Sequence, residues 1–172
     1  MTPIAEIPIF GSTDELLLGI LQDFFEGQGI HIGTLYSEET SPPMIIARAD
    51  RRSAGRNYEM GDDRFMHPVL VSISTITSGK DADEIGEELQ EAIRVCLRQA
   101  QMKQTVIPNG GSINRITNMS APVRVSDYAT STSVVQYASL PTGHVRYESQ
   151  WRLIIRPPAQ DTITNRFLTP EP

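Results

Sequence analysis

The side chains that could do metal or thiol chemistry are few and widely spaced. His31, His67 and His144 fall on three separate predicted strands, and none has a second ligand at helical or turn spacing. The sequence therefore predicts no metal site. Cys96, the one cysteine, falls on the apolar face of a predicted helix, where a thiol packs as a small core residue. A single cysteine also cannot form an intrachain disulfide.

Motifs for nucleophilic catalysis or phosphate binding do not occur. Gly110-Gly111-Ser112 fits neither the serine elbow G-x-S-x-G nor the phosphate loop G-x-x-x-x-G-K-[ST], and it is typical of a turn. The acid pair Asp62-Asp63 lies in a predicted loop, where carboxylates are normally solvated. We expect a protein that is not an enzyme and uses no cofactor and no metal ion. The alternative from a different functional class is a small cytoplasmic enzyme with an unrecognised site.

Arginines gather at two places that could bind nucleic acid. One group shares a face of a predicted strand and the other shares a loop: Arg146, Arg152 and Arg156, and Arg51, Arg52 and Arg56. A single-strand platform needs aromatic rings among the basic residues, but Tyr147 and Trp151 alternate onto the opposite face. Glu148 interrupts the row, and the net charge is −6. These observations favour a subunit interface or a solvated face, with a nucleic-acid-binding module as a third class.

Length and composition suit one domain with a modest core. The chain has 172 residues, of which 39% are hydrophobic. No apolar run approaches the roughly 20 residues that a membrane-spanning helix needs, so no membrane association is expected. The first basic residue is Arg48, and the acidic residues before it argue against a signal peptide.

Two helices are expected to pack against the predicted strands. Ser12-Thr13-Asp14-Glu15 matches a capping box, and apolar residues at helical spacing follow to about Glu26. A second helix over 81–102 has acids in its first half and bases toward its end, which complements the helix dipole. Its predicted apolar face consists of Ile85, Leu89, Ile93, Cys96 and Ala100.

Five strands are expected, at about 30–33, 44–49, 64–77, 112–125 and 144–156, the fourth interrupted or ended near Pro122. The last strand alternates strictly, with Val145 to Ile155 (odd positions) on one covered face. The stretch 104–143 carries three charges and is predicted to be too polar for the core, with a long hairpin or extended loop over 127–143. The fold class is α/β (α+β): a mixed or antiparallel sheet of about five strands packed against two helices. The chain is one domain (1–172), with an arm (1–11), a core (12–157) and a tail (158–172).

The order of these elements resembles the tail terminator family of long-tailed phages, which are small α/β proteins at the head-proximal end of the tail. The similarity covers roughly residues 12–157. It includes the helix at 81–102 and the closing strand His144-Val145-Arg146-Tyr147-Glu148-Ser149-Gln150-Trp151-Arg152-Leu153. The family has no catalytic residues to carry over.

The resemblance implies a structural virion protein, made in the host cytoplasm and located at the tail's head-proximal end. It implies a homo-oligomeric ring, expected to be a hexamer, that caps the tail tube and joins it to a head-completion or neck protein. Double-stranded DNA would pass through the channel without specific binding. Another head–tail connector, or a head- or tail-completion subunit, is the close alternative.

A ring closes by a heterologous contact, in which one surface meets a different surface of the next subunit. We expect that contact to use the loop over 50–63 and the stretch over 130–143, with loop arginines pairing with helix acids of a neighbour. The candidate interface residues are Arg51, Arg52, Arg56, Tyr58, Glu87, Glu91, Tyr137, Arg146 and Arg152.

Overall fold

The computed structural model describes residues 11–37, 39–50, 66–125 and 143–159. The predicted capping box begins the first helix, α1 (Thr13–Phe24): the Glu15 amide donates to Ser12 Oγ at 3.4 Å. Asp14 and Glu15 place negative charge in the first turn, where the helix dipole favours it. Leu16, Leu17, Ile20 and Leu21 form its buried face.

The strands make one mixed sheet, which confirms the predicted fold class. Their order across the sheet is β1-β2-β3-β6-β5-β4, with β1 and β2 parallel and every other neighbouring pair antiparallel. The two-residue β4 was not predicted. The bounds are β1 (His31–Gly33), β2 (Met44–Asp50), β3 (His67–Ser78), β4 (Val106–Ile107), β5 (Gly111–Arg124) and β6 (His144–Arg156).

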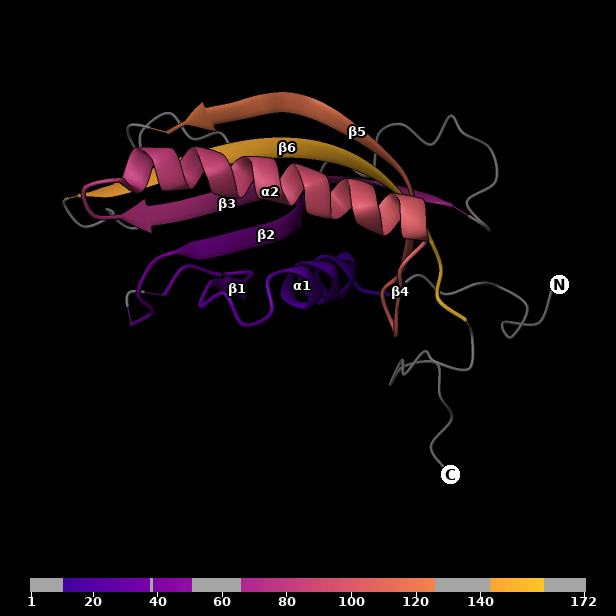
Figure 1. Cartoon of the computed structure of the whole chain (residues 1–172). Helices are drawn as coiled ribbons and strands as arrows, with labels where there is room; N and C mark the ends of the chain where they lie inside the picture. Colours follow the sequence, from indigo (N-terminus) through magenta and orange to yellow (C-terminus); the bar gives the residue numbers. More distant parts are fainter. Residues whose placement is uncertain (1–10, 38, 51–65, 126–142, 160–172) are drawn as a thin grey trace, which may run out of the picture.

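Helix α2 (Ala82–Lys103) crosses the sheet in front of β3, β6 and β5 (Figure 1). Leu89, Ile93, Cys96 and Ala100 are buried as predicted. The prediction for Ile85 is wrong, because its side chain is 39% exposed. Gly86 faces the sheet at this level instead, and a Cβ added there would lie 2.8 Å from Cδ2 of Tyr147. The tyrosine ring thus occupies the space that a larger helix residue would need.

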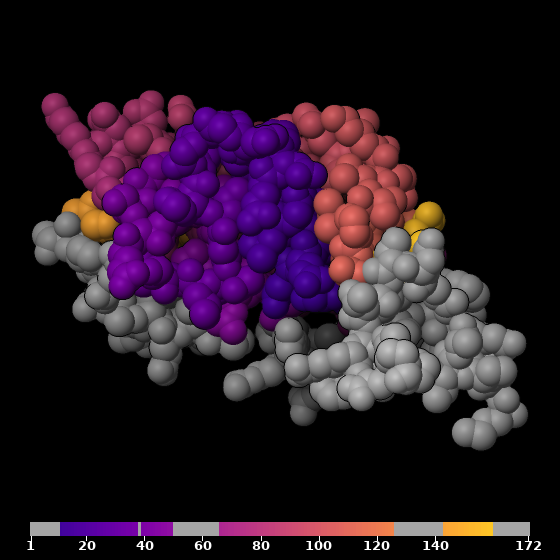
Figure 2. All heavy atoms as spheres, turned by 90° about the horizontal axis from the view of Figure 1, so that it is seen from below, coloured from indigo at the N-terminus to yellow at the C-terminus, as the bar shows by residue number. Residues whose placement is uncertain are grey.

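Both helices pack on the same side of the sheet. The main core joins buried residues of α1 and α2 with Ile45, Val71, Ile73 and Leu153 of the strands. A space-filling view from below shows α1 and the segment to β2 in the middle of the molecule, with residues near 100 beside α1 (Figure 2). On the opposite sheet face, a small cluster of Met44, Ile46 and Ile76 packs with Tyr36.

β5 differs from its prediction in two ways. It continues through Pro122, and its pairing with β6 shifts register at three places. β4 pairs only with Gly111 and Ser112, so β5 is an edge strand at Pro122, where the missing N–H of proline breaks no ladder. Ile113 and Ile116 of β5 are buried core residues, so the expectation that 104–143 lies outside the core is wrong at these positions.

The outer edge of β2 is closed by two different devices. β1 pairs with Met44–Ile46, and further along the strand the Ala49 amide donates to Oδ1 of Asp14 at 2.9 Å. A side chain from the first turn of α1 therefore satisfies an edge donor that β1 does not reach. Neither helix in the described ranges is both long and apolar enough to cross a membrane.

Candidate functional site on the central strand

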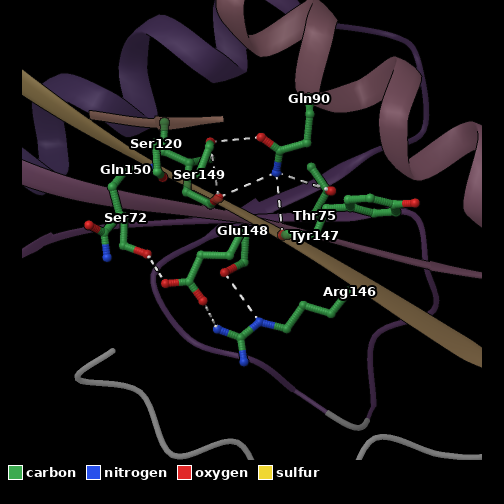
Figure 3. Close-up of polar contacts among 11 residues, drawn as sticks. Ser72, Thr75, Gln90, Ser120, Arg146, Tyr147, Glu148, Ser149 and Gln150 are labelled. Carbon is green, nitrogen blue, oxygen red and sulfur yellow. Dashed lines mark hydrogen bonds and ion pairs between the residues drawn. The ribbon is translucent and has the colours of Figure 1, made fainter. Parts of the chain in front are cut away.

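Most of the buried polar side chains among the described residues lie on two neighbouring strands, β3 and β6, and β6 lies between β3 and β5 in the sheet. Alternation sends Tyr147 and Ser149 toward α2, while Arg146 and Glu148 lie on the opposite face (Figure 3). The predicted division of this strand into two faces is confirmed. Each face builds its own hydrogen-bonded cluster.

On the helix side, Gln90 of α2 is the centre of the cluster. Its side chain is 1% exposed, and its Nε2 lies 3.3 Å from each of three acceptors: the Ile73 carbonyl, Thr75 Oγ1 and the Tyr147 carbonyl. Its Oε1 accepts from Ser149 Oγ at 2.7 Å. Because a buried amide without partners is costly, this set of acceptors fixes where α2 sits along β3 and β6.

Tyr147 connects this cluster with exposed residues of α2. Its hydroxyl lies 2.9 Å from Oδ1 of Asp83 and 3.2 Å from Oε1 of Glu87, both on α2. Burial, together with these two carboxylates, raises the pKa of Tyr147 to about 12. Asp83 also forms an exposed ion pair with Arg124 of β5 at 3.1 Å. The first turns of α2 are thus attached to both β6 and β5.

The opposite face holds an ion pair with little access to water. The guanidinium of Arg146 pairs with Glu148, and the two side chains are 4% and 11% exposed. Glu148 also accepts from Ser72 Oγ at 2.9 Å, and Arg146 Nε donates to Ser74 Oγ at 3.4 Å. Such a pair needs its extra hydrogen bonds, because desolvation otherwise outweighs the attraction between the charges.

These clusters bind and orient polar groups, but they do not form a nucleophile with its base. Ser149 Oγ accepts from Trp151 Nε1 at 2.9 Å and donates to an amide oxygen, which does not activate a hydroxyl. Burial raises the pKa of the Cys96 thiol to about 12. Cys96 lines an open groove between α1 and α2, together with Asp23 and Lys103. In the described part of the chain, no three His, Cys, Asp or Glu residues gather as metal ligands would.

The predicted interface residues fall in three places. Arg51, Arg52, Arg56, Tyr58 and Tyr137 lie outside the described residues, as do most of the two segments expected to form the ring contact. Glu87 and Glu91 lie one turn apart on the exposed face of α2, where Glu91 pairs with Arg94 at 2.6 Å. That pair lowers the pKa of Glu91 and raises that of Arg94, chiefly through their hydrogen bond.

Arg146 and Arg152 share the sheet face away from the helices. Arg152 is half-buried, with Leu70 and Thr117 as its cross-strand neighbours, while Arg146 is buried in its ion pair. Within one chain, the structure therefore separates the acids of α2 from these arginines by the thickness of the sheet.

Sequence reasoning missed Gln90 and the role of its partners. The signal that could have found them is a set of polar residues at covered strand positions, Thr75 and Ser149. Two hydroxyls facing a core need a polar group across from them, and Gln90 stands beside Leu89 at the edge of the apolar row of α2. Comparison of the chain with protein-family models finds no match, and comparison with curated proteins finds none either.

Proposed function

We propose that this protein is a structural subunit of a phage virion, a tail terminator that forms a ring at the head-proximal end of the tail. The proposal rests on the order of the elements and on what each contributes. An N-terminal helix and three strands precede the acidic helix α2, and the chain closes on β6, the long strand at the centre of the sheet.

The chemistry of the described residues supports a structural role. Their polar groups are used to hold α2 and the strands together, as the contacts of Gln90 and Tyr147 illustrate. The surface of α2 is rich in carboxylates, and the whole chain carries a net charge of −6. A ring of such subunits would repel DNA phosphates, so duplex DNA could slide through a central channel.

Capping of tail tubes tests the function directly. Purified protein is added to polymerising tube protein of the same phage, and the tubes are imaged by negative-stain electron microscopy. A terminator should place a ring at one end of each tube and stop growth there. Tubes that elongate to the same lengths with and without the protein would refute the proposal. Binding to isolated heads instead of tubes would assign it to the head-completion class.

The ring contact is tested by charge reversal in the loop. If Arg52 and Arg56 pair with acids of a neighbouring subunit, the double variant Arg52→Glu/Arg56→Glu should lose the ring at the tube end. The matched control reverses two exposed charges that belong to neither the loop nor the outer face of α2, Lys80→Glu/Arg115→Glu. A double loop variant that still assembles a ring of normal size would show that these arginines do not form the contact.

A further inference from the structure

The outer side of α2 carries one straight row of side chains with an ordered charge pattern. The spacing between successive members of the row alternates between four and three residues. This spacing places them in a line along the helix, on the side away from the sheet. All are exposed except Val95, which is partly buried, and Met102 is 82% exposed. From first to last the row is Glu84, Glu88, Glu91, Val95, Arg98 and Met102.

The acidic half of this row works against the isolated helix. Glu84 and Glu88 are four residues apart, as are Glu87 and Glu91, and like charges at this spacing repel. The helix dipole accounts only for acids in the first turn, Asp83 and Glu84. Among the residues that the structure describes, Glu84 and Glu88 take part in no ion pair. A cationic surface placed against them would remove this repulsion.

The cationic surface that fits is the other half of the same row. A second α2 can lie antiparallel to the first with Ile93 of the two copies at the same height. Each residue then faces the residue of the other copy that lies equally far beyond Ile93 in the opposite direction along the sequence. Glu88 then faces Arg98 of the second copy. Glu84 lies against the exposed Met102 of that copy. A two-fold axis repeats each contact, so every match occurs twice.

We propose that two copies of this chain associate through their α2 helices, antiparallel about a two-fold axis. The contact is closed, because each copy uses the same surface, and it cannot propagate around a ring. It is therefore a different contact from the ring contact, although Glu91 belongs to both surfaces, and it describes the protein before it meets a tail tube. Because the facing groups are mostly exposed charges, the dimer is expected to be weak and sensitive to salt.

Sedimentation equilibrium with charge swaps tests the pairing. At low salt the wild-type mass should rise with concentration toward two chains, and 0.5 M NaCl should reverse this. Glu88→Arg and Arg98→Glu should each weaken the dimer at least tenfold, and the double variant should return to within about threefold of wild type. Glu26→Arg changes the same charge at an exposed position just beyond α1 and should have no effect.

The register is tested by cross-linking the double variant Glu84→Cys/Met102→Cys, which keeps the charges of Glu88 and Arg98. The two positions lie about 27 Å apart along one helix, too far for an intrachain disulfide. Mild oxidation should therefore give a covalent dimer, while Glu84→Cys alone should not; the native Cys96 is buried. Failure of wild type to dimerise at low salt, failure of the charge swap to restore it, or equal cross-linking by the single variant would overturn the proposal. Tube capping by Glu88→Arg is expected to be normal, so each proposal can fail without the other.

Discussion

Ser149 of β6 and Gln90 of α2 are joined by a 2.7 Å hydrogen bond inside the core. The amide has only one other polar atom, Nε2, which faces three acceptors on β3 and β6. The position of α2 along the sheet thus depends on an amide as well as on apolar packing. Such a cluster is specific, because sliding α2 by one turn would break all four hydrogen bonds of the Gln90 amide.

Replacement of Gln90 by leucine should destabilise the protein by about 2–4 kcal/mol. The new side chain has a similar volume, but it leaves Thr75 and Ser149 buried without their amide partner. Urea unfolding followed by circular dichroism measures the change. The control is Gln99→Leu, at an exposed position of the same helix. Equal losses in the two variants would show that the cluster contributes nothing specific.

The ion pair between Arg146 and Glu148 should behave unlike the exposed pair on α2. Arg146→Met is expected to cost about 3–5 kcal/mol, since it leaves a carboxylate with little access to water. The double variant Arg146→Met/Glu148→Met should recover much of that loss. Arg94→Met, which breaks the exposed pair with Glu91, should have little effect on stability. Denaturant midpoints of the four proteins give the comparison.

Gly86→Ala should destabilise the protein, although alanine is the better helix former by about 1 kcal/mol. The added Cβ would come within 2.8 Å of Tyr147 Cδ2 and 3.3 Å of Thr77 Oγ1. The tyrosine ring cannot easily yield, because its hydroxyl is held by two carboxylates of α2. Thermal unfolding would show whether the substitution lowers or raises stability. A higher melting temperature for Gly86→Ala would contradict this packing.

Stability should fall in alkali as Tyr147 loses its proton. The folded state raises this pKa from 10.0 to about 12, so the unfolded chain releases the proton first as the pH rises. The contribution is therefore complete below pH 10 and is lost between pH 10 and about 12. Tyr147→Phe should show a shallower decline in this range. Cys96, whose pKa is also about 12, remains in both proteins and so cancels in the comparison. Absorbance at 295 nm should show one phenol titrating late in wild type only.

The elements with strong periodicity could be predicted from the sequence. Ser12 caps α1, and the strict alternation of β6 assigned its two faces, because each of these patterns has a single physical interpretation. Ile85 was placed wrongly because a helical row of apolar residues does not show where the opposing ring of Tyr147 ends. That contact depends on which strand α2 crosses.

The candidate site was harder to predict. The buried pair of Arg146 and Glu148 depends on two serines of β3: Ser74 accepts from Arg146 and Ser72 donates to Glu148. Only the pairing of β3 with β6 brings these serines into reach. Strand order is not encoded in local pattern, so an arginine on a strand reads as exposed. Pro122 likewise reads as a strand end, because an edge position and a central position cannot be distinguished along the sequence.

The hydrogen bond from the Ala49 amide to the Asp14 carboxylate affects how the protein behaves at high concentration. Sheets with open edges tend to join one another nonspecifically, since backbone groups pair without regard to side chains. Here one edge is closed by β1 and a carboxylate, while β5 is bent out of regular register three times and contains Pro122. Both devices discourage strand-to-strand aggregation when many copies accumulate. Any selective self-assembly of this chain would then depend on contacts between side chains and not on pairing of strand edges.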